Sequence, residues 1–192
     1  MADELRGKTI AIIATDGVEQ VELTEPRKAV ESAGASTVLL SPSAGEIQAM
    51  NSDINPADTF TVDQAVSDAS PNEFDGLILP GGTVNADRLR LEDEVVSFVQ
   101  EFFKSGKPAG VICHGPWALV EADLVRDRTL TSFPSLQTDI RNAGGKWVDE
   151  EVVVDQGLVT SRNPDDLPAF CAKIVEEFAE GRHDVAAAGA TA

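Results

Sequence analysis

The chain has 192 residues, of which 42% are hydrophobic and 25% charged, a composition typical of a soluble globular protein. Thirty-three acidic and fifteen basic residues give a formal net charge of −18, which opposes binding to a phosphate backbone, so no nucleic acid partner is expected. No apolar run approaches the ~20 residues of a membrane span, and the polar N-terminus lacks the apolar core of a secretory signal, so we expect a cytoplasmic protein with no membrane partner.

The length predicts a single domain over residues 1–180. The Ala- and Gly-rich stretch 181–192, which contains His183, is expected to be a disordered tail without a functional role. The two cysteines, Cys113 and Cys171, lie far apart in the sequence, which disfavours a structural disulfide. Cys171 falls on the last predicted helix beside Phe170, where we expect it to pack in the core.

The first predicted strand, Thr9–Ala14, is almost continuously apolar, as in a central parallel strand covered on both faces. A loop that carries Glu19 and Glu22 follows, and a helix is expected to begin at Thr24 with Pro26 in its first turn. Loops that leave the C-terminal ends of parallel strands carry the chemistry of many α/β proteins. Glu19 and Glu22 are therefore candidate site residues.

The next segments continue the alternation of strands and helices. Thr37–Ser41 and Gly76–Leu79 are predicted strands, and Glu92–Ser105 has the apolar spacing of a helix. Between the two strands, Pro42–Pro71 predicts a small antiparallel excursion, to which we assign no chemistry.

Pro80-Gly81-Gly82 follows the second of these strands and has two interpretations. A tight turn explains the glycines by itself. Alternatively, the backbone N–H groups beside Gly81 and Gly82 help to bind an oxyanion near a nucleophile.

A sharp turn from a buried strand into a helix is predicted within Lys107–Trp117, whose centre reads Val-Ile-Cys-His-Gly-Pro. This places Cys113 at a nucleophile elbow, with Gly115 allowing the chain to fold back closely. Unpaired N–H groups and the helix macrodipole would favour a thiolate there. A buried cysteine acting as a small hydrophobe is the alternative, but such a residue needs neither His114 nor the Gly-Pro turn.

The last third of the chain contains short strands followed by a closing helix. The predicted strands are Leu130–Ser132, Trp147–Val148, Val152–Val154 and Leu158–Ser161, and the predicted helices are Pro134–Ala143 and Pro164–Glu180. With right-handed crossovers this order predicts an α/β protein whose mostly parallel sheet is covered by helices on both faces.

Motifs for other chemistries are missing from the sequence. It has no Gly-x-Gly-x-x-Gly after the first strand, no Walker-type Gly-Lys-Ser/Thr, no Cys-x-x-Cys and no Gly-x-Ser-x-Gly. Its only two histidines are His114 and His183, which disfavours zinc. We therefore expect neither a cofactor nor a metal, and any Cys–His mechanism must use His114.

Several motifs together resemble the ThiJ/PfpI family, in its PfpI-like intracellular protease or general stress branch. They are Val-Ile-Cys-His-Gly-Pro-Trp at Val111–Trp117, Leu-Pro-Gly-Gly at Leu79–Gly82, and Glu19 and Glu22 after the first strand. The resemblance covers nearly the whole chain. It implies a flavodoxin-like three-layer αβα sandwich, related to class I glutamine amidotransferases, that forms a homodimer or a hexamer.

The resemblance also implies roles for particular residues. Cys113 would be the nucleophile, with the carboxyl of Glu22 beside it and Glu19 at another acidic position of the same loop. The oxyanion donors would be the backbone N–H groups of Gly82 and His114. In PfpI relatives an acidic residue of the neighbouring subunit orients the histidine, and Asp87 matches it if one residue is inserted after Pro80-Gly81-Gly82.

The ionisation of Glu22 decides its effect on the sulfur. A carboxylate would raise the pKa of the Cys113 thiol, whereas a protonated carboxyl that donates a hydrogen bond would lower it. We predict the protonated form, with the two groups titrating as a coupled pair.

These observations predict an enzyme in which Cys113 attacks an electrophilic carbon. A small-molecule carbonyl substrate would make it a deglycase or a glyoxalase-like enzyme, and a peptide substrate would make it an intracellular peptidase. The alternative is a stress protein in which peroxide oxidises Cys113, with chaperone-like binding as its output.

Overall fold

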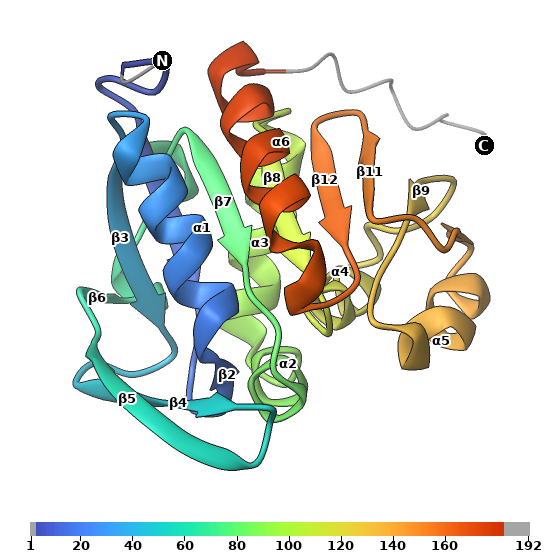
Figure 1. The fold of residues 1–192 in the computed structure, drawn as a ribbon, viewed down its shortest axis with the longest axis horizontal. Helices are drawn as coiled ribbons and strands as arrows, with labels where there is room; N and C mark the ends of the chain where they lie inside the picture. Colours follow the sequence, from blue (N-terminus) through green and yellow to red (C-terminus); the bar gives the residue numbers. More distant parts are fainter. Residues whose placement is uncertain (1–2, 183–192) are drawn as a thin grey trace.

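The computed structural model describes residues 3–182 and has three layers, with a central sheet between two layers of helices (Figure 1). The tail expected over residues 181–192, which includes His183, lies outside the described residues except for residues 181 and 182. Within residues 3–182, no helix is both long enough and apolar enough to cross a membrane.

The central sheet has seven strands in the order β11-β12-β8-β7-β1-β3-β6. All neighbouring pairs are parallel except β11 and β12, which are antiparallel. The strands are β1 (Thr9–Ile13), β3 (Ser36–Ser41), β6 (Gln64–Ala65), β7 (Gly76–Leu79), β8 (Ala109–Ile112), β11 (Val152–Asp155) and β12 (Leu158–Ser161). The predicted mostly parallel α/β sandwich is confirmed.

The central strands are mostly apolar because their side chains supply the cores on both faces of the sheet. In β1, Ala11 and Ile13 belong to the core cluster on one face of the sheet, whereas Ile10 and Ile12 belong to the cluster on the other. Successive side chains of a strand point to opposite faces, so a strand covered on both sides cannot alternate apolar with polar residues.

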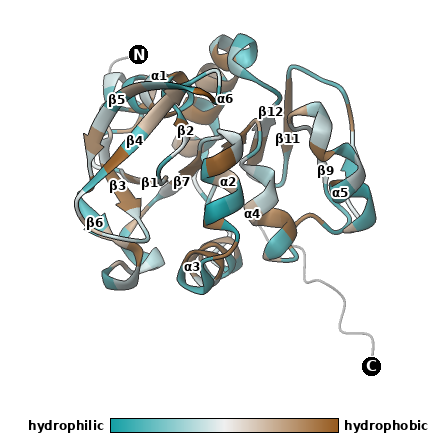
Figure 2. Ribbon diagram, turned by 90° about the horizontal axis from the view of Figure 1, so that it is seen from below, coloured by the Kyte–Doolittle hydropathy of each residue, from teal (hydrophilic) through white to brown (hydrophobic). Residues whose placement is uncertain are grey.

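Helices α1 and α6 pack together over one face of the sheet, and α2, α3 and α4 cover the other, as Figures 1 and 2 show from two directions. The apolar side of α3, with Phe98, Val99 and Phe102, faces the sheet. The helices are α1 (Gln20–Ser32), α2 (Thr83–Leu89), α3 (Asp93–Lys104), α4 (Pro116–Glu121), α5 (Gln137–Asn142) and α6 (Leu167–Glu180).

The antiparallel excursion predicted for residues 42–71 is confirmed in part of that segment. It contains β4 (Glu46–Asn51) and β5 (Asn55–Thr61), which form a hairpin that extends through β2 (Val18–Glu19) into a three-stranded sheet. The segment also includes β6 and the short 3-10 helix η1 (Val66–Asp68).

Two predicted strands do not join the central sheet. The segments predicted at 130–132 and 147–148 are β9 (Thr129–Leu130) and β10 (Lys146–Trp147), which pair with each other in a separate two-stranded sheet beside α5. Two predicted helices begin as 3-10 turns, η3 (Pro134–Leu136) before α5 and η4 (Pro164–Asp166) before α6. A further 3-10 turn, η2 (Pro71–Glu73), precedes β7.

The first helix begins earlier than predicted, and this changes the position of Glu22. Helix α1 starts at Gln20 rather than at Thr24, so Glu22 lies in its first turn instead of in a loop, and Pro26 lies inside the helix. Proline usually marks a first turn because it lacks an N–H. Here tertiary packing outweighs that local preference, since both Glu22 and Pro26 are buried against the body of the protein.

Candidate active site

Cys113 lies one residue beyond β8 with a φ of +60°, a left-handed conformation that is rare for residues other than glycine. Its N–H donates to the Ser161 carbonyl at 3.0 Å, and its own carbonyl accepts from the Phe133 N–H at 2.8 Å. These bonds to neighbouring segments hold the strained backbone in place. The sharp turn from strand to helix expected from the sequence is therefore present, with α4 beginning three residues later at Pro116.

The imidazole of His114 lies beside the sulfur, with Nδ1 3.2 Å from Cys113 Sγ. The ring stacks on Phe133 at a centroid distance of 4.6 Å and meets Trp117 in a tilted arrangement at 5.3 Å. Burial lowers the pKa of His114, which favours the neutral ring. A neutral imidazole can act as a general base towards the thiol.

Glu22 approaches the same sulfur from α1 and is completely buried. Its Oε2 accepts a hydrogen bond from the Gly81 N–H at 2.8 Å, whereas its buried Oε1 has no hydrogen-bond partner in the described part of the chain. Burial is the main cause that raises the pKa of Glu22 to about 8, against the lowering effect of its hydrogen bonds. At neutral pH the carboxyl is therefore mostly protonated.

Burial has the largest effect on the ionisation of Cys113. The residue is only 6% exposed, and desolvation is the largest cause that raises the pKa of its thiol, followed by the charge of an ionised Glu22. Hydrogen bonds from the backbone N–H groups of Gly82 and His114 lower it. The sequence interpretation considered the helix terminus and Glu22 but omitted the desolvation that opposes a standing thiolate.

The two N–H groups expected to bind an oxyanion both lie at the sulfur, and the glycines of the preceding turn make this possible. A Cβ on Gly81 would lie 2.6 Å from Cys113 Cβ and would overlap Glu22. Gly82 has a φ of +89°, and a Cβ there would overlap the Gly17 carbonyl. The backbone of Pro80-Gly81-Gly82 thus packs directly against Cys113, and its role in binding an oxyanion stays a prediction.

Glu19 does not lie beside the sulfur but holds the tip of the β4–β5 hairpin. Its two carboxylate oxygens accept the backbone N–H groups of Ser52 and Asp53, each at 3.0 Å. Both residues of the tip have positive φ values, 55° and 63°, which are unusual for non-glycine residues. Glu19 therefore stabilises a strained turn at the edge of the site.

Asp87 is an exposed residue of α2. Among the described residues, the side chains that reach Nε2 of His114 are instead Thr83, at 3.4 Å, and Ser135, at 3.3 Å. The role of Asp87 towards the histidine of a neighbouring subunit remains a prediction.

Sequence reasoning missed the polar residues that frame the site from other segments. Asn85 is completely buried on α2, where its Oδ1 accepts from the Thr15 N–H and its Nδ2 donates to the carbonyls of Pro80 and Gly81. It thereby joins the loop after β1 to the turn after β7. Asp53 bonds to Thr83 from the hairpin, a segment to which we had assigned no chemistry. The polar Asn-Ser-Asp tip was visible in the sequence, but its position over α2 was not.

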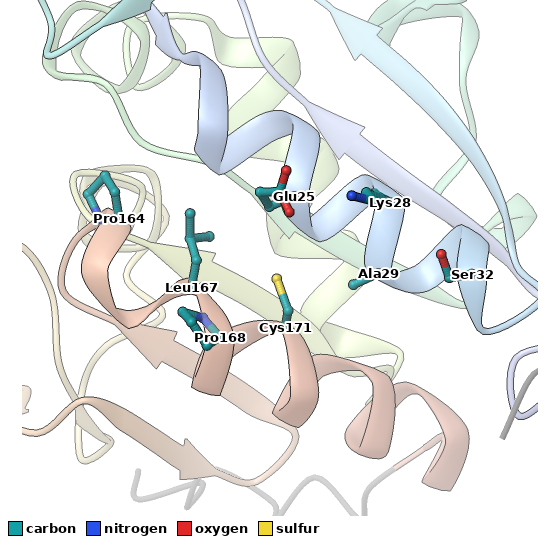
Figure 3. Close-up of a pocket in the computed structure, with 8 residues that line it drawn as sticks. All are labelled: Glu25, Lys28, Ala29, Ser32, Pro164, Leu167, Pro168 and Cys171. Atoms are coloured by element: carbon teal, nitrogen blue, oxygen red, sulfur yellow. The ribbon is translucent and has the colours of Figure 1, made fainter.

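Cys171 lies away from these residues, and both cysteines are free. It packs against the core under α1 and α6, as expected, but its sulfur also points into a hollow of about 450 Å³ between those helices (Figure 3). Glu25 and Lys28 of α1 and Leu167 of α6 line the same hollow. Within residues 3–182, no group of three or more His, Cys, Asp or Glu side chains is arranged to hold a metal ion.

Comparison with known proteins places the chain among relatives whose names refer to enzymes. It is 41% identical over 165 residues to protein/nucleic acid deglycase 2 of Escherichia coli (strain K12), covering 85% of this chain and 93% of that protein. It is 40% identical over 164 residues to a Bacillus subtilis (strain 168) protein provisionally named cysteine protease YraA, covering 85% and 94%.

Solved structures share the fold. A two-domain Anabaena variabilis protein with DJ-1/ThiJ/PfpI-like and ferritin-like domains matches with a TM-score of 0.83 and 34% identity, over 88% of this chain and 47% of that one. Drosophila melanogaster DJ-1beta matches with a TM-score of 0.81 and 25% identity, over 90% of each chain. These neighbours confirm the predicted flavodoxin-like fold. The model of the DJ-1/PfpI family matches residues 8–177, and the chain belongs to that family.

Proposed function

We propose that the protein is a cofactor-independent enzyme that uses Cys113 to attack the carbonyl carbon of a small molecule, as a deglycase or a glyoxalase-like enzyme does. The observation that carries the proposal is the set of groups around one sulfur. A base lies 3.2 Å away at His114 Nδ1, and the backbone N–H groups of Gly82 and His114 lower the pKa of the thiol. Relatives of similar length that carry the names deglycase and cysteine protease support a hydrolytic reaction.

The first step follows from this arrangement. His114 Nδ1 takes the thiol proton while Sγ forms a bond to the carbonyl carbon, and the electron pair of the broken C–O π bond moves to the oxygen. The backbone N–H groups of Gly82 and His114, which lower the pKa of the thiol in the free protein, would stabilise the resulting oxyanion. A neutral Glu22 adds no negative charge to this centre.

Access to the sulfur favours a small carbonyl over a peptide. Cys113 is 6% exposed and His114 is 4% exposed, and the turn at Gly81 packs directly against both residues. An extended peptide needs a groove along which its backbone can lie, whereas a small aldehyde needs only a recess. Methylglyoxal and its adducts with amines or thiols are therefore the substrates that we propose.

The environment of the thiol also supports an enzyme over a peroxide sensor. A sensor cysteine reacts as an exposed, standing thiolate. Here burial raises the pKa of the Cys113 thiol, and a base lies in direct contact. A thiol of this kind gives up its proton as it attacks a bound substrate.

The test measures product formation from methylglyoxal, from a methylglyoxal-modified amino acid and from a short peptide with the wild type, Cys113→Ser and His114→Ala. We expect turnover of the first two substrates and at least a 100-fold loss in both variants, since a general base contributes about 10²–10⁴-fold and the covalent step requires the thiol. Cys171→Ser is the matched control, because that cysteine lies outside the site, and should retain activity.

Hydrolysis of the peptide alone would replace the proposal with a peptidase. Graded oxidation of Cys113 by peroxide, without turnover of any substrate, would replace it with a sensor. The assembly, expected to be a homodimer or a hexamer, stays a prediction that analytical ultracentrifugation tests.

A further inference from the structure

A chain of hydrogen bonds joins the tip of the β4–β5 hairpin to the imidazole of His114. Asp53 Oδ1 accepts the Thr83 N–H at 2.7 Å, and its Oδ2 accepts the Thr83 hydroxyl at 3.0 Å. The oxygen of that hydroxyl lies 3.4 Å from His114 Nε2, and the opposite ring nitrogen lies 3.2 Å from Cys113 Sγ. A carboxylate on one segment is thus connected through two side chains to the sulfur on another.

The direction of each bond follows from which groups can donate. An ionised carboxylate only accepts, so the Thr83 hydroxyl must give its single proton to Asp53. The oxygen of Thr83 is then an acceptor towards the ring, which favours a proton on His114 Nε2. In the neutral ring this leaves the lone pair on Nδ1, the nitrogen that faces the thiol.

We propose that Asp53, acting through Thr83, is the positioning carboxylate of the active site and holds His114 in the tautomer that accepts the Cys113 proton. This proposal rests on the proposed function, because it gives the base for that reaction. In the attack, the proton leaves Sγ for Nδ1 as the C–S bond forms, and the imidazolium keeps its Nε2 proton bonded to the hydroxyl of Thr83.

The neighbouring groups explain why this hydroxyl, rather than another, sets the tautomer. Ser135 also lies 3.3 Å from Nε2, but it is an exposed residue whose hydroxyl can turn to donate or accept. Thr83 is held at two points by Asp53, and the backbone of Asp53 is held by Glu19. The negative charge of Asp53 also raises the pKa of His114 against the lowering effect of burial.

Asparagine at position 53 is the most direct perturbation. Its amide can still accept the Thr83 N–H, but its NH₂ group donates to the Thr83 oxygen and frees the hydroxyl proton to point at Nε2. The preferred tautomer should then change to Nδ1–H, which cannot accept the thiol proton. Glu19 bonds to the backbone of the tip, so the turn itself should remain.

The tautomer can be observed directly because the chain has only two histidines. In protein labelled with ¹⁵N-histidine and carrying His183→Asn, every ring signal comes from His114. We expect Nε2–H with an unprotonated Nδ1 in this background, and a shift towards Nδ1–H when Asp53→Asn or Thr83→Val is added. Thr83→Ser keeps the hydroxyl and should restore the first pattern.

Kinetics on methylglyoxal and the pH profile of Cys113 alkylation by iodoacetamide give a second readout. Asp53→Asn and Thr83→Val should lower kcat about tenfold or more with KM within about twofold, since a base in the wrong tautomer loses much of its contribution. Thr83→Ser should recover most of kcat. Asp68→Asn, which removes one exposed charge on η1, controls for net charge and should match the wild type.

Several results would overturn the proposal. An unchanged His114 tautomer in folded Asp53→Asn would do so, and so would equal activities of Thr83→Val and Thr83→Ser. A change of tautomer in Asp87→Asn but not in Asp53→Asn would assign the role to Asp87 of a neighbouring subunit. The spectra need no substrate, so a protein that turns over no carbonyl compound but shows the expected tautomers refutes the proposed function and leaves this inference standing.

Discussion

Glu22→Gln should remove a large pH dependence of stability that the buried carboxyl imposes on the fold. The side chain is completely buried, and its pKa rises from 4.5 to about 8, mainly through desolvation. Glutamine has the same shape, can still accept the Gly81 N–H, and does not titrate in this range. The substitution therefore removes the ionisation while keeping the packing.

The sign follows from which state holds the proton. Between about pH 4.5 and 8 the unfolded chain has lost the Glu22 proton while the folded protein keeps it. The stabilisation is thus complete below pH 4.5 and is lost as the pH rises through about 8. At 1.36 kcal/mol for each pH unit between the two values, the free energy of unfolding falls by roughly 5 kcal/mol over this window.

Urea unfolding of the wild type and Glu22→Gln at a series of pH values measures the effect. The difference between the two free energies of unfolding should change by several kcal/mol from about pH 5 to pH 8, in favour of the variant at higher pH. Glu25→Gln, three residues further along α1 and exposed, should follow the wild-type curve. Parallel curves for wild type and Glu22→Gln would refute the claim that this carboxyl is protonated in the folded protein.

Three further changes test the framework of the site and the surface. In urea unfolding, Gly82→Ala should lower the free energy of unfolding by about 2 kcal/mol more than Gly7→Ala does. Both glycines have a positive φ, but only a Cβ at position 82 would overlap the backbone of Gly17. Equal losses in the two variants would contradict this steric argument. In the same assay, Asn85→Ala should lower the free energy of unfolding by about 3 kcal/mol, because it leaves several buried groups without hydrogen-bond partners. Replacing the exposed Asn142 by Ala should cost only about 0.5 kcal/mol. A similar loss in both variants would argue against the role of Asn85 in joining the two loops. Raising the KCl concentration from about 0.1 to 2 M should raise the urea concentration at the unfolding midpoint, because salt screens the repulsion within a chain of net charge −18. A constant or falling midpoint would show that this repulsion does not affect stability.

Local patterns in the sequence were sufficient for the architecture and for the sharp turn that carries Cys113. Continuous apolar runs predicted strands covered on both faces, and the segment around Cys113 predicted a turn from strand to helix, because both properties depend on adjacent residues. The predicted first residues of the helices were less accurate, since α1 begins at Gln20 rather than at Thr24. Its early start depends on the burial of Glu22 and Pro26, which no window of neighbouring residues reports.

The tertiary structure alone decided which polar groups meet at the sulfur and how they are ionised. The parallel order of β1, β7 and β8 brings α1, the Gly81–Gly82 turn and Cys113 together, and this contact desolvates Glu22 and raises its pKa. Asp53 reaches the site from a hairpin 60 residues before Cys113 in the sequence. Sequence patterns describe neighbours along the chain, whereas desolvation and hydrogen-bond partners depend on segments that only folding brings into contact.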